Sequence, residues 1–425
     1  MATLVRRRWE SDVASGLPRR DRRSCEYEAY IPDPLSGRPF RLDGAVAADV
    51  ADAERAIQRL DTQATALLDT EAPARLLLRA EAVASSHIEG LEIGGRRLLR
   101  AEAARELGIA PEDVTADEVI GNIEAMTWAI ARLANARAIT VAGLLEVHRR
   151  LLARTRLEAQ GGRIRDTQNW IGGSSYNPCS ASFVPPPPEH VHGLLEDLCA
   201  FCNAGDLPAV VQAAVSHAQF ETIHPFADGN GRTGRALIHV ILRRRGLTTR
   251  VQPPISLVLA TWAKDYVGGL MMTRYVGDAD STGALEAYDR WLGVFAAACS
   301  RAAADALTFE QRILGIQERW SRSLGTVRRN SAVERLIAML PGAPIVTVSS
   351  AAGLVRRSFE RTNQAIARLV EAGVLRAITV GRRNRAFEAR AVVDAFADLE
   401  RQLASPVVDS RSSPPRRPAP RRRSR

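Results

Sequence analysis

Long apolar runs are missing from this 425-residue chain. No stretch of eighteen consecutive apolar residues occurs, and the first 23 residues are charged throughout. A membrane-spanning helix needs about 20 apolar residues, and a secretory signal needs an apolar centre. The sequence therefore predicts no membrane contact. With 46% hydrophobic and 25% charged residues, the chain can form a sizeable core, and its length suits two or three domains.

Lysine is almost absent. Lys264 is the single lysine among 58 basic residues, so arginine carries the net charge of +10. A Walker A loop needs a lysine after its glycine-rich turn, and Lys264 follows no such turn. The arginine bias also makes any one arginine weak evidence for function. Residues 405–425 hold seven arginines and one acid, and we expect them to form a disordered basic tail.

Cysteine is scarce as well. The chain has five cysteines: Cys25, Cys179, Cys199, Cys202 and Cys299. They are too few for a disulfide framework at this length, and a reducing cytoplasm fits this composition. Cys199 and Cys202 form one C-x-x-C pair inside an apolar helical segment, without a second pair to complete a zinc site. We expect them to pack a helix face in a cytoplasmic protein.

The densest group of polar and glycine residues runs from His224 to Arg235, with the sequence HPFADGNGRTGR. Gly229 and Gly231 allow several backbone N–H groups to point to one place, and a helix that begins there adds its positive dipole end. Arg232 and Arg235 lie three residues apart on one helix face, where both can bind phosphate oxygens. The pattern predicts a polyphosphate site.

Two side chains beside this site can take part in a reaction. His224 can take a proton near neutral pH, and Asp228 offers the carboxylate oxygen that Mg²⁺ prefers. A dinucleotide-binding fold is disfavoured, because its G-x-G-x-x-G turn needs a preceding strand and an acid about twenty residues later. Here residues 209–223 read as a helix, and no acid lies between Asp228 and Asp265. The H-E-x-x-H zinc pattern is also missing.

The segment resembles the signature of the Fic family (filamentation induced by cAMP), His-x-Phe-x-(Asp/Glu)-Gly-Asn-Gly-Arg-x-x-Arg, at every fixed position. The resemblance implies a protein adenylyltransferase, which transfers AMP from ATP to a Ser, Thr or Tyr hydroxyl of a target protein or of itself. It implies His224 as the general base, Asp228 as the Mg²⁺ ligand and Arg235 as the partner of the γ-phosphate, with Asn230 and Arg232 on the α- and β-phosphates. The implied nucleotide-binding residues are Phe226, Gly229, Asn230, Gly231, Arg232, Gly234 and Arg235.

A second pattern lies upstream. Residues 72–90 read as a helix in which Ser85 and Glu89 share one face and Gly90 can end the helix. The pattern resembles the inhibitory (Ser/Thr)-x-x-x-Glu-(Gly/Asn) helix of Fic proteins. The resemblance implies that Ser85, Glu89 and Gly90 are inhibitory and that Glu89 pairs with Arg235. The alternative is an ordinary exposed glutamate near a helix end.

Residues 162–188 predict a β-hairpin, because two short strand-like runs flank a polar turn and a run of four prolines ends the second. Fic proteins carry such a flap beside the active site, and an extended target segment could pair along its edge. The expected docking residues are Asn169, Trp170, Ile171, Phe183 and Val184. A purely structural hairpin is the alternative.

From residue 331 onward, three short helices followed by two strands predict a winged helix-turn-helix domain over 331–404. The candidate DNA contacts are Arg356, Arg357, Arg361, Asn363, Gln364, Arg382 and Arg383. Winged helices also serve as protein-docking or dimer modules, so DNA and a second copy of the chain are both open as partners.

The predicted fold is mainly α: a Fic-type helical bundle with a β-hairpin flap and a C-terminal winged helix. We expect an N-terminal segment at 1–110, irregular and extended up to about residue 44, a catalytic core at 111–310 and a helical linker at 311–330. Three other functions stay open. The same site could remove AMP, with Glu89 positioning water. It could transfer another phosphorylated group, as the Fic-related Doc toxin does, or the chain could be a DNA-binding regulator with a vestigial nucleotide site.

Overall fold

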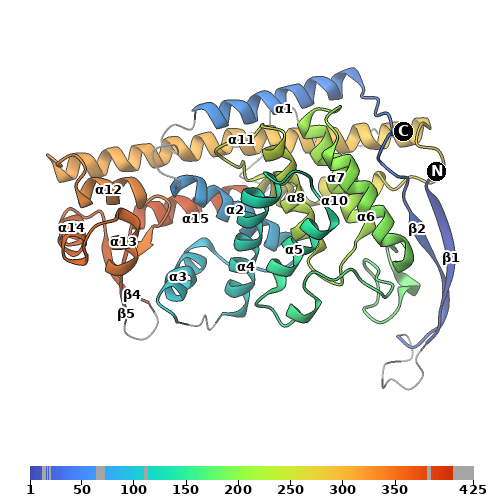
Figure 1. The fold of residues 1–425 in the computed structure, drawn as a ribbon, viewed down its shortest axis with the longest axis horizontal. Helices are drawn as coiled ribbons and strands as arrows, with labels where there is room; N and C mark the ends of the chain where they lie inside the picture. Colours follow the sequence, from blue (N-terminus) through green and yellow to red (C-terminus); the bar gives the residue numbers. More distant parts are fainter. Residues whose placement is uncertain are drawn as a thin grey trace.

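The computed structural model describes residues 1–11, 16, 18, 21–63, 72–109, 113–380 and 384–404. These residues form a mainly helical protein with two small sheets, which confirms the predicted fold class (Figure 1). The expected basic tail at 405–425 and the candidate DNA contacts Arg382 and Arg383 lie outside the described residues.

Eleven α-helices lie in the described part of the chain before residue 325. They are α1 (Gly44–Gln63), α2 (Ala72–Ile88), α3 (Gly95–Glu106), α4 (Val114–Trp128), α5 (Val141–Leu152), α6 (Pro188–Asn203), α7 (Ala209–Ile223), α8 (Asn230–Arg244), α9 (Ile255–Thr261), α10 (Ala263–Met272) and α11 (Thr282–Leu324). A π-helical turn, Ala129–Leu133, continues α4. The Thr140 side chain caps α5 by accepting from the Gly143 N–H. The predicted helix end at Gly90 is confirmed, because Gly90 adopts the left-handed conformation (φ 83°) just after α2.

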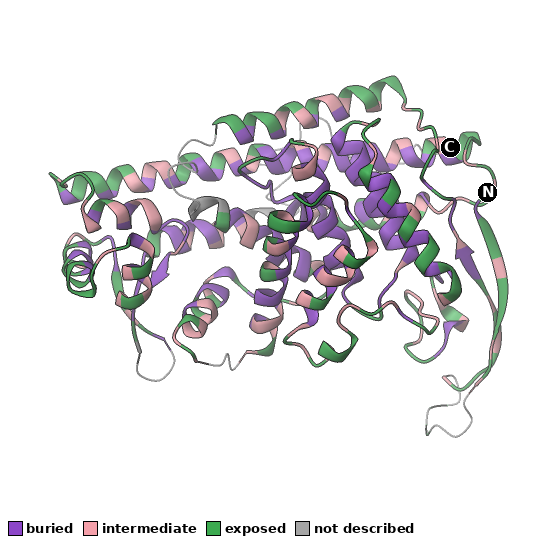
Figure 2. Cartoon of the chain, viewed as in Figure 1, coloured by how far each residue is buried: buried purple, intermediate pink, exposed green. Residues whose placement is uncertain are grey.

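Helix α7 lies at the centre, with all fifteen of its residues buried, and α8 packs against it (Figure 2). Alanine and valine dominate its first half, so neighbouring helices can approach it closely on every side. Its second half carries polar residues that are buried as well, among them Gln219, Glu221 and Thr222. The two helices meet at the loop 224–229, so this loop is anchored at both ends in buried helices.

Helix α2 is fixed to the core by buried polar contacts. The Glu81 carboxylate accepts from the Ser256 backbone N–H at 2.7 Å, and the Nε2 of His239 on α8 lies 2.8 Å from it. Both Glu81 and His239 are fully buried. The Asn122 amide donates to the Ala82 carbonyl and the Ser86 hydroxyl. Because unpaired buried polar groups are costly, these contacts define one position for α2 along α8.

Helix α11 runs the length of the molecule with α1 beside it (Figure 1). It continues from the predicted core into the predicted linker without a break, and the linker is helical up to Leu324. Among the described residues, α11 is the one helix that meets the length and composition of a membrane span. However, 67% of its most apolar stretch is buried inside the protein, as in the core helix of a soluble protein.

The N-terminal segment differs from the expectation of an irregular chain. Strands β1 (Thr3–Trp9) and β2 (Cys25–Ile31) pair antiparallel, with Thr3 opposite Ile31 and Trp9 opposite Cys25. This N-terminal ribbon runs along one edge of the molecule (Figure 1). Extended backbone was predicted correctly, but its pairing was missed, because two polar strands joined through a long connection carry no local hairpin signal.

A disulfide joins Cys25, at the start of β2, to Cys179, with 154 residues between them in sequence. The expectation that the cysteines form no disulfide framework is therefore wrong for this pair. Two cysteines so far apart in sequence give no spacing signal, and only the fold brings their Cα atoms within 5.8 Å. Cys199, Cys202 and Cys299 are buried and free, and Cys199 and Cys202 pack in the core as predicted.

The C-terminal module comprises α12 (Ala332–Met339), β3 (Ile345–Val346), α13 (Val348–Val355), α14 (Phe359–Glu371), β4 (Arg376–Val380), β5 (Asn384–Glu388) and α15 (Arg390–Ala404). Its sheet order is β3-β5-β4. The predicted order of three helices and a hairpin is present, whereas α15 was not predicted. The winged-helix assignment and the domain boundaries stay predictions.

The C-terminal module packs on α2 and α3 through charged contacts. Arg96 donates to the fully buried Glu388 at 3.0 Å, and Glu400 accepts from the Gly95 backbone N–H at 2.8 Å. A side chain on Gly95 would overlap the ring of Phe396. On α2, Arg79 donates to the Gly342 carbonyl at 2.9 Å. The module is thus part of the same body as the helix that precedes Glu89.

Candidate functional site

The loop between α7 and α8 has two left-handed residues. His224 ends α7 with φ 49°, and Gly229 precedes α8 with φ 76°. Asn230 closes the loop, because its side chain accepts from the Phe226 N–H and donates to the Phe226 carbonyl, both at 2.8 Å. A non-glycine residue at positive φ is strained, and such strain is kept where the surrounding structure holds it. The loop is therefore preorganised.

The start of α8 has the features of an anion site. The first backbone bond of this helix runs from the Thr233 N–H to the Gly229 carbonyl, so the preceding N–H groups have no acceptor within the helix. Arg232 is 3% exposed and contacts Asp228 through one nitrogen at 3.1 Å. Its Nε and Nη1 are buried and have no hydrogen-bond partner in the described part of the chain. Buried donors without acceptors at a helix start favour a bound anion.

Arg235 lies one turn further along α8 and is held from three sides. Its Nε donates to the Ser85 hydroxyl at 2.9 Å, and its Nη2 donates to the Ser85 carbonyl and the Glu89 carboxylate, both at 2.7 Å. Tyr266 contributes a longer contact of 3.4 Å. The predicted pair of Glu89 and Arg235 is thus present, and Ser85 orients the guanidinium.

The Glu89 carboxylate lies directly over Gly231, in the mouth of the anion site. A Cβ on Gly231 would overlap a Glu89 oxygen, so glycine is required for this approach. Burial alone would raise the pKa of Glu89, but the charge and hydrogen bond of Arg235 outweigh it and hold that pKa below its ordinary value. A carboxylate therefore stands where the sequence predicts a phosphate.

His224 is a half-buried imidazole whose Nδ1 has no hydrogen-bond partner among the described residues. Its carbonyl accepts from Arg165 at 2.8 Å and Asn169 at 3.3 Å, which fixes the backbone. Burial, followed by the charges of Arg274 and Arg165, lowers the pKa of His224 to about 4. The imidazole is therefore neutral at pH 7, which is the state that accepts a proton.

Asp228 is the predicted Mg²⁺ ligand. Its side chain is 48% exposed and is paired only with Arg232 among the ion pairs of the described residues. In the same residues, no group of three His, Cys, Asp or Glu side chains is close enough to hold a metal ion. One exposed carboxylate fits the way Mg²⁺ is usually held with nucleotides, by one or two carboxylates plus phosphate oxygens.

His148 connects three parts of the site and is not among the site residues predicted from the sequence. It is buried, and its ring stacks on Phe226 with centroids 3.7 Å apart. Its Nδ1 accepts from the Gly162 N–H at 3.1 Å, and its Nε2 lies 3.0 Å from the Asp228 carbonyl. Burial lowers the pKa of His148 to about 4, so the neutral ring can make both bonds.

The predicted flap is shorter than expected, because its only pairing is a single bridge between Ile171 and Phe183. A 3₁₀ turn, Pro178–Ser180, occupies part of the predicted loop. Asn169 faces the loop and donates to the carbonyls of His224 and Phe226. The edge at Val184 is not free, since its carbonyl accepts from the Tyr30 N–H at 2.9 Å. The chain's own N-terminal ribbon therefore covers part of the predicted docking edge.

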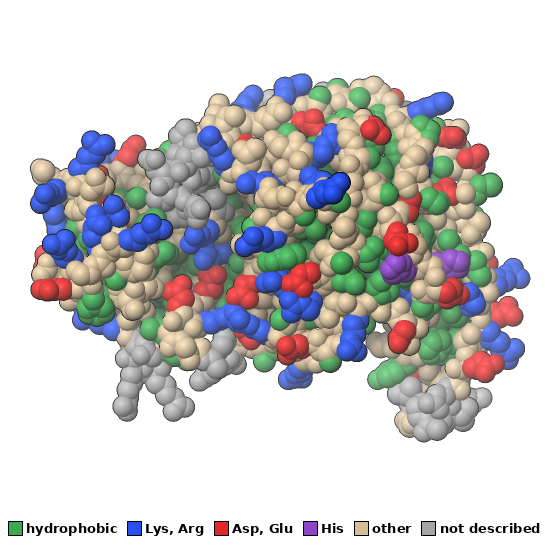
Figure 3. All heavy atoms as spheres, in the orientation of Figure 1, with side chains coloured by type: hydrophobic (Ala, Val, Ile, Leu, Met, Phe, Trp, Pro, Cys, Tyr) green, Lys and Arg blue, Asp and Glu red, His purple; other side chains and the backbone are tan. Residues whose placement is uncertain are grey.

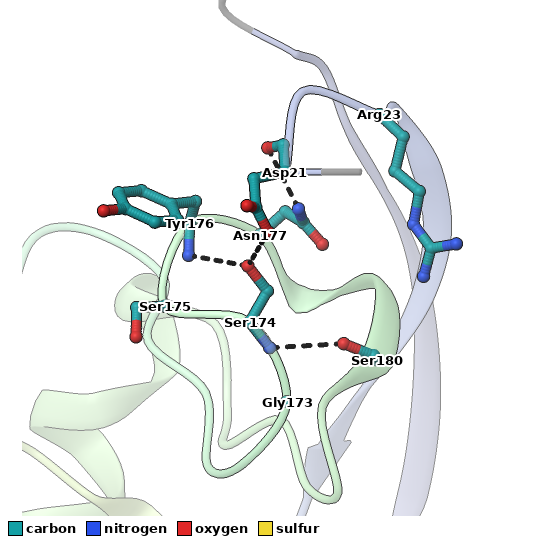
Figure 4. A pocket seen from close by; sticks show the side chains of 8 residues that line it. All are labelled: Asp21, Arg23, Gly173, Ser174, Ser175, Tyr176, Asn177 and Ser180. Carbon is teal, nitrogen blue, oxygen red and sulfur yellow. Dashed lines mark hydrogen bonds between the residues drawn. The ribbon is translucent and has the colours of Figure 1, made fainter. Parts of the chain in front are cut away.

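Two cavities lie between the flap and the N-terminal ribbon. The first, of about 500 Å³, is polar, and in Figure 4 the Ser174 hydroxyl and the Asn177 amide both point to Asp21. The second, of about 490 Å³, has both Phe183 and Arg274 among its lining residues. Neither is lined by the loop 224–229, since the Glu89 side chain covers the start of α8.

Glu221 and Arg274 lie beside the site and were missed from the sequence. The Glu221 carboxyl is buried behind Gly234, and its Oε1 has no partner in the described part of the chain. Burial raises the pKa of Glu221 to about 7, although the charges of Arg235 and Arg274 act in the opposite direction. Position 221 lies three residues before His224, but Arg274 is fifty residues away and no local pattern indicates it.

The candidate DNA contacts lie on the C-terminal module, far along the chain from the anion site. Arg361, Asn363 and Gln364 are exposed on α14, whereas Arg357 donates to the carbonyls of Arg356 and Asn330. Figure 3 shows basic side chains over this end of the molecule, at the left. DNA contact stays a prediction.

Residues 47–131 match the Fic/DOC family N-terminal profile, and residues 138–242 match the Fic/DOC family profile. A protein adenylyltransferase Fic of Culex quinquefasciatus is 32% identical over 215 residues, which is 48% of this chain and 40% of the relative. Protein adenylyltransferase fic-1 of Caenorhabditis elegans is 33% identical over 155 residues, or 35% of this chain and 28% of the relative.

The chain thus spans less than half the length of these curated relatives. Among solved structures, a Fic family protein from Desulfovibrio desulfuricans G20 has a TM-score of 0.50 and 20% identity, covering 83% of this chain and 97% of that chain. That likeness shows the fold. The two profile matches contain the loop 224–229 and the helix that precedes Glu89.

Proposed function

The chain carries a Fic/DOC domain preceded by a Fic/DOC N-terminal region, and on that premise we propose that it is a protein adenylyltransferase. It transfers AMP from ATP to a Ser, Thr or Tyr hydroxyl of a target protein or of itself. The observation that carries the proposal is Arg232, a buried guanidinium with two N–H groups free for an anion at the start of α8. The names of the relatives support the same reaction.

Each residue of the site has a separate role in the proposed reaction. ATP lies with its phosphates over the start of α8, where Arg232 and the backbone N–H groups bind them. The acceptor hydroxyl gives its proton to His224 while its oxygen attacks the α-phosphorus. The new phosphorus–oxygen bond forms as the bond between the α- and β-phosphates breaks, and pyrophosphate leaves. Positioning and charge neutralisation supply most of the acceleration in such transfers.

Asp228 is the residue that would hold Mg²⁺ in this reaction, since its carboxylate is exposed beside the anion site. A bound Mg²⁺ would neutralise phosphate charge there. The protein's own contribution is independent of the ion: Asn230 fixes the loop, and the burial of His224 keeps its imidazole neutral.

Glu89 makes the resting protein an inhibited enzyme. Its carboxylate occupies Arg235 and covers Gly231, so the γ-phosphate of ATP has to displace it. A second outcome of the same geometry is AMP removal, in which a carboxylate at this position orients water for attack on an AMP ester. Incubation of AMP-modified protein without ATP separates the two reactions, because only removal then releases AMP.

The His224→Ala variant tests the proposal. Loss of a general base typically costs about 10²- to 10⁴-fold in rate, while nucleotide affinity should not change, because His224 lies outside the start of α8. Intact-mass spectrometry after incubation with ATP and Mg²⁺ reports AMP added to the chain, and calorimetry reports ATP binding. AMP addition at the parental rate in the variant would show that the base lies elsewhere.

A further inference from the structure

Arg274 connects three segments that come from distant parts of the sequence. It follows α10, and its guanidinium carbon lies 3.6 Å from the ring centroid of Phe183 on the flap. Its Nε and Nη2 point to the Thr222 hydroxyl at 3.4 Å and the Glu221 carbonyl at 3.5 Å, both on the last turn of α7. That turn ends at His224. One side chain therefore lies between the flap and the helix that carries the base.

The ring contact is the strongest of these interactions. A guanidinium over an aromatic face within about 6 Å is attracted by the ring, and more so where water is partly excluded. Phe183 is 9% exposed, and its ring also packs against Tyr30 of the N-terminal ribbon at 5.9 Å. The two hydrogen bonds are long and weak by comparison. The flap is thus held at Phe183 from both sides, by Arg274 and by the N-terminal ribbon.

We propose that Arg274 is a positioning residue of the transfer reaction: it fixes the flap against the last turn of α7 and so sets the place of the acceptor hydroxyl relative to His224. The inference rests on the proposed function and adds a residue that the Fic motif does not contain. Both Arg274 and Phe183 also line the cavity of about 490 Å³ between the flap and the N-terminal ribbon.

The charge of Arg274 supports this role. Four groups from four parts of the fold act on His224. After burial, Arg274 and then Arg165 lower its pKa, while the Glu89 carboxylate and the Glu221 carbonyl raise it. A positive charge at position 274 thus keeps the imidazole unprotonated under mildly acidic conditions. Because the folded pKa lies below the ordinary value, the base is active above about pH 4, and removing the charge moves this limit upward.

Three substitutions in the full chain separate charge from packing. The parent carries Glu89→Ala, so that the site is open to ATP. Arg274→Met keeps an apolar side chain of similar length and removes the charge. Arg274→Lys keeps the charge but loses the planar group that stacks on the ring. Phe183→Leu removes the ring and leaves Arg274 in place. Arg319→Met, at an exposed site on α11, is the matched arginine control.

Two measurements are needed. The first is the initial rate of AMP incorporation into the chain at saturating ATP and Mg²⁺ between about pH 3 and 8, a range that includes the limit near pH 4. In Arg274→Met we expect the acid limb of this profile to move upward by roughly one pH unit, as for loss of a neighbouring charge. Arg274→Lys and Phe183→Leu should keep the parental limb. ATP affinity should stay unchanged in every variant.

The second measurement is amide hydrogen exchange at Phe183, whose N–H bonds to the Ile171 carbonyl. Loss of the ring contact should speed this exchange roughly two- to fivefold in all three variants, and Arg319→Met should not change it. Hydrogen exchange needs no enzymatic activity. If the parent adds no AMP, the proposed function fails while the flap contact is still measured.

The results that would overturn the inference are specific. An unshifted acid limb in Arg274→Met would show that Arg274 takes no part in the reaction. Faster exchange would not alter this conclusion, because the loss of a purely structural contact also speeds exchange. Unchanged exchange in both Arg274→Lys and Phe183→Leu would show that the stacking does not hold the flap. If Arg274→Met fails to fold, Arg274→Lys and Phe183→Leu still decide the flap contact, and unchanged exchange in both then overturns the proposal.

Discussion

Removing the carboxylate at Glu89 should activate AMP transfer, and the structure allows the size of the effect to be worked out. The pair of Glu89 and Arg235 has one contact of 2.7 Å, with Arg235 1% and Glu89 34% exposed. A hydrogen bond between charged groups contributes about 1.5–3 kcal/mol, and a fully exposed ion pair contributes about 0–1 kcal/mol. Because one partner is buried and the other is partly exposed, we expect this pair to contribute about 2–3 kcal/mol to the inhibited state.

A tenfold change in rate corresponds to about 1.4 kcal/mol, so this free energy predicts a rate increase of roughly 30- to 140-fold for Glu89→Ala. Glu89→Gln should give a smaller increase, because its amide oxygen can still accept from Arg235. The initial rate of AMP incorporation into the chain at subsaturating ATP measures both. Glu92→Ala, three residues further and exposed, should leave the rate unchanged.

The same substitution has a stability signature. Without Glu89, the buried charge of Arg235 keeps only the Ser85 contacts and the long Tyr266 contact, so the unliganded variant should melt at a lower temperature than the parent. ATP should then raise the melting temperature of the variant more than that of the parent, by mass action. An increase in rate of less than about threefold in Glu89→Ala, far below the 2–3 kcal/mol worked out above, would refute the inhibitory role.

Two further predictions concern stability. The pKa of Glu221 is raised to about 7, so the folded state keeps its proton between about pH 4.5 and 7 while the unfolded state loses it, and this group lowers stability as pH rises through that window. Glu221→Gln should therefore gain stability over the parent at pH 8 but not at pH 4.5 in denaturant titrations, and an equal difference at both values would contradict the reasoning. Gly95→Ala, whose methyl group would overlap Phe396, should cost about 1–3 kcal/mol, whereas Gly94→Ala has open space and should cost little. Equal costs for these two variants would mean that the C-terminal module does not pack on α3 as described.

The sequence predicted the parts of the site that are encoded within one short segment. The anion site needs only the glycines, the arginines and the helix start between His224 and Arg235, and all of them are local. The Glu89 pattern is also local, and only its partner, 146 residues away, had to be taken from the family resemblance. The mainly α fold followed from helical periodicity in the same way.

The missed features depend on contacts between distant segments. Arg274 reaches His224 only because α10 packs beside α7. The N-terminal ribbon has polar strands, and its pairing with the flap through Tyr30 and Val184 has no counterpart in local periodicity. In the flap itself, the two predicted strand-like runs meet at one bridge, between Ile171 and Phe183, and the 3₁₀ turn at Pro178 lies in the loop between them. Local sequence patterns indicate which residues can form a site, and the packing of helices determines which of these residues come into contact.

The disulfide between Cys25 and Cys179 has a topological consequence. It turns the segment between these residues, from β2 through α5 to the flap, into one closed covalent loop that includes Glu89. A single proteolytic cut anywhere inside this loop leaves both fragments attached to each other until the bond is reduced. The Glu89 carboxylate therefore stays tethered to the protein, even after the backbone beside it has been cleaved.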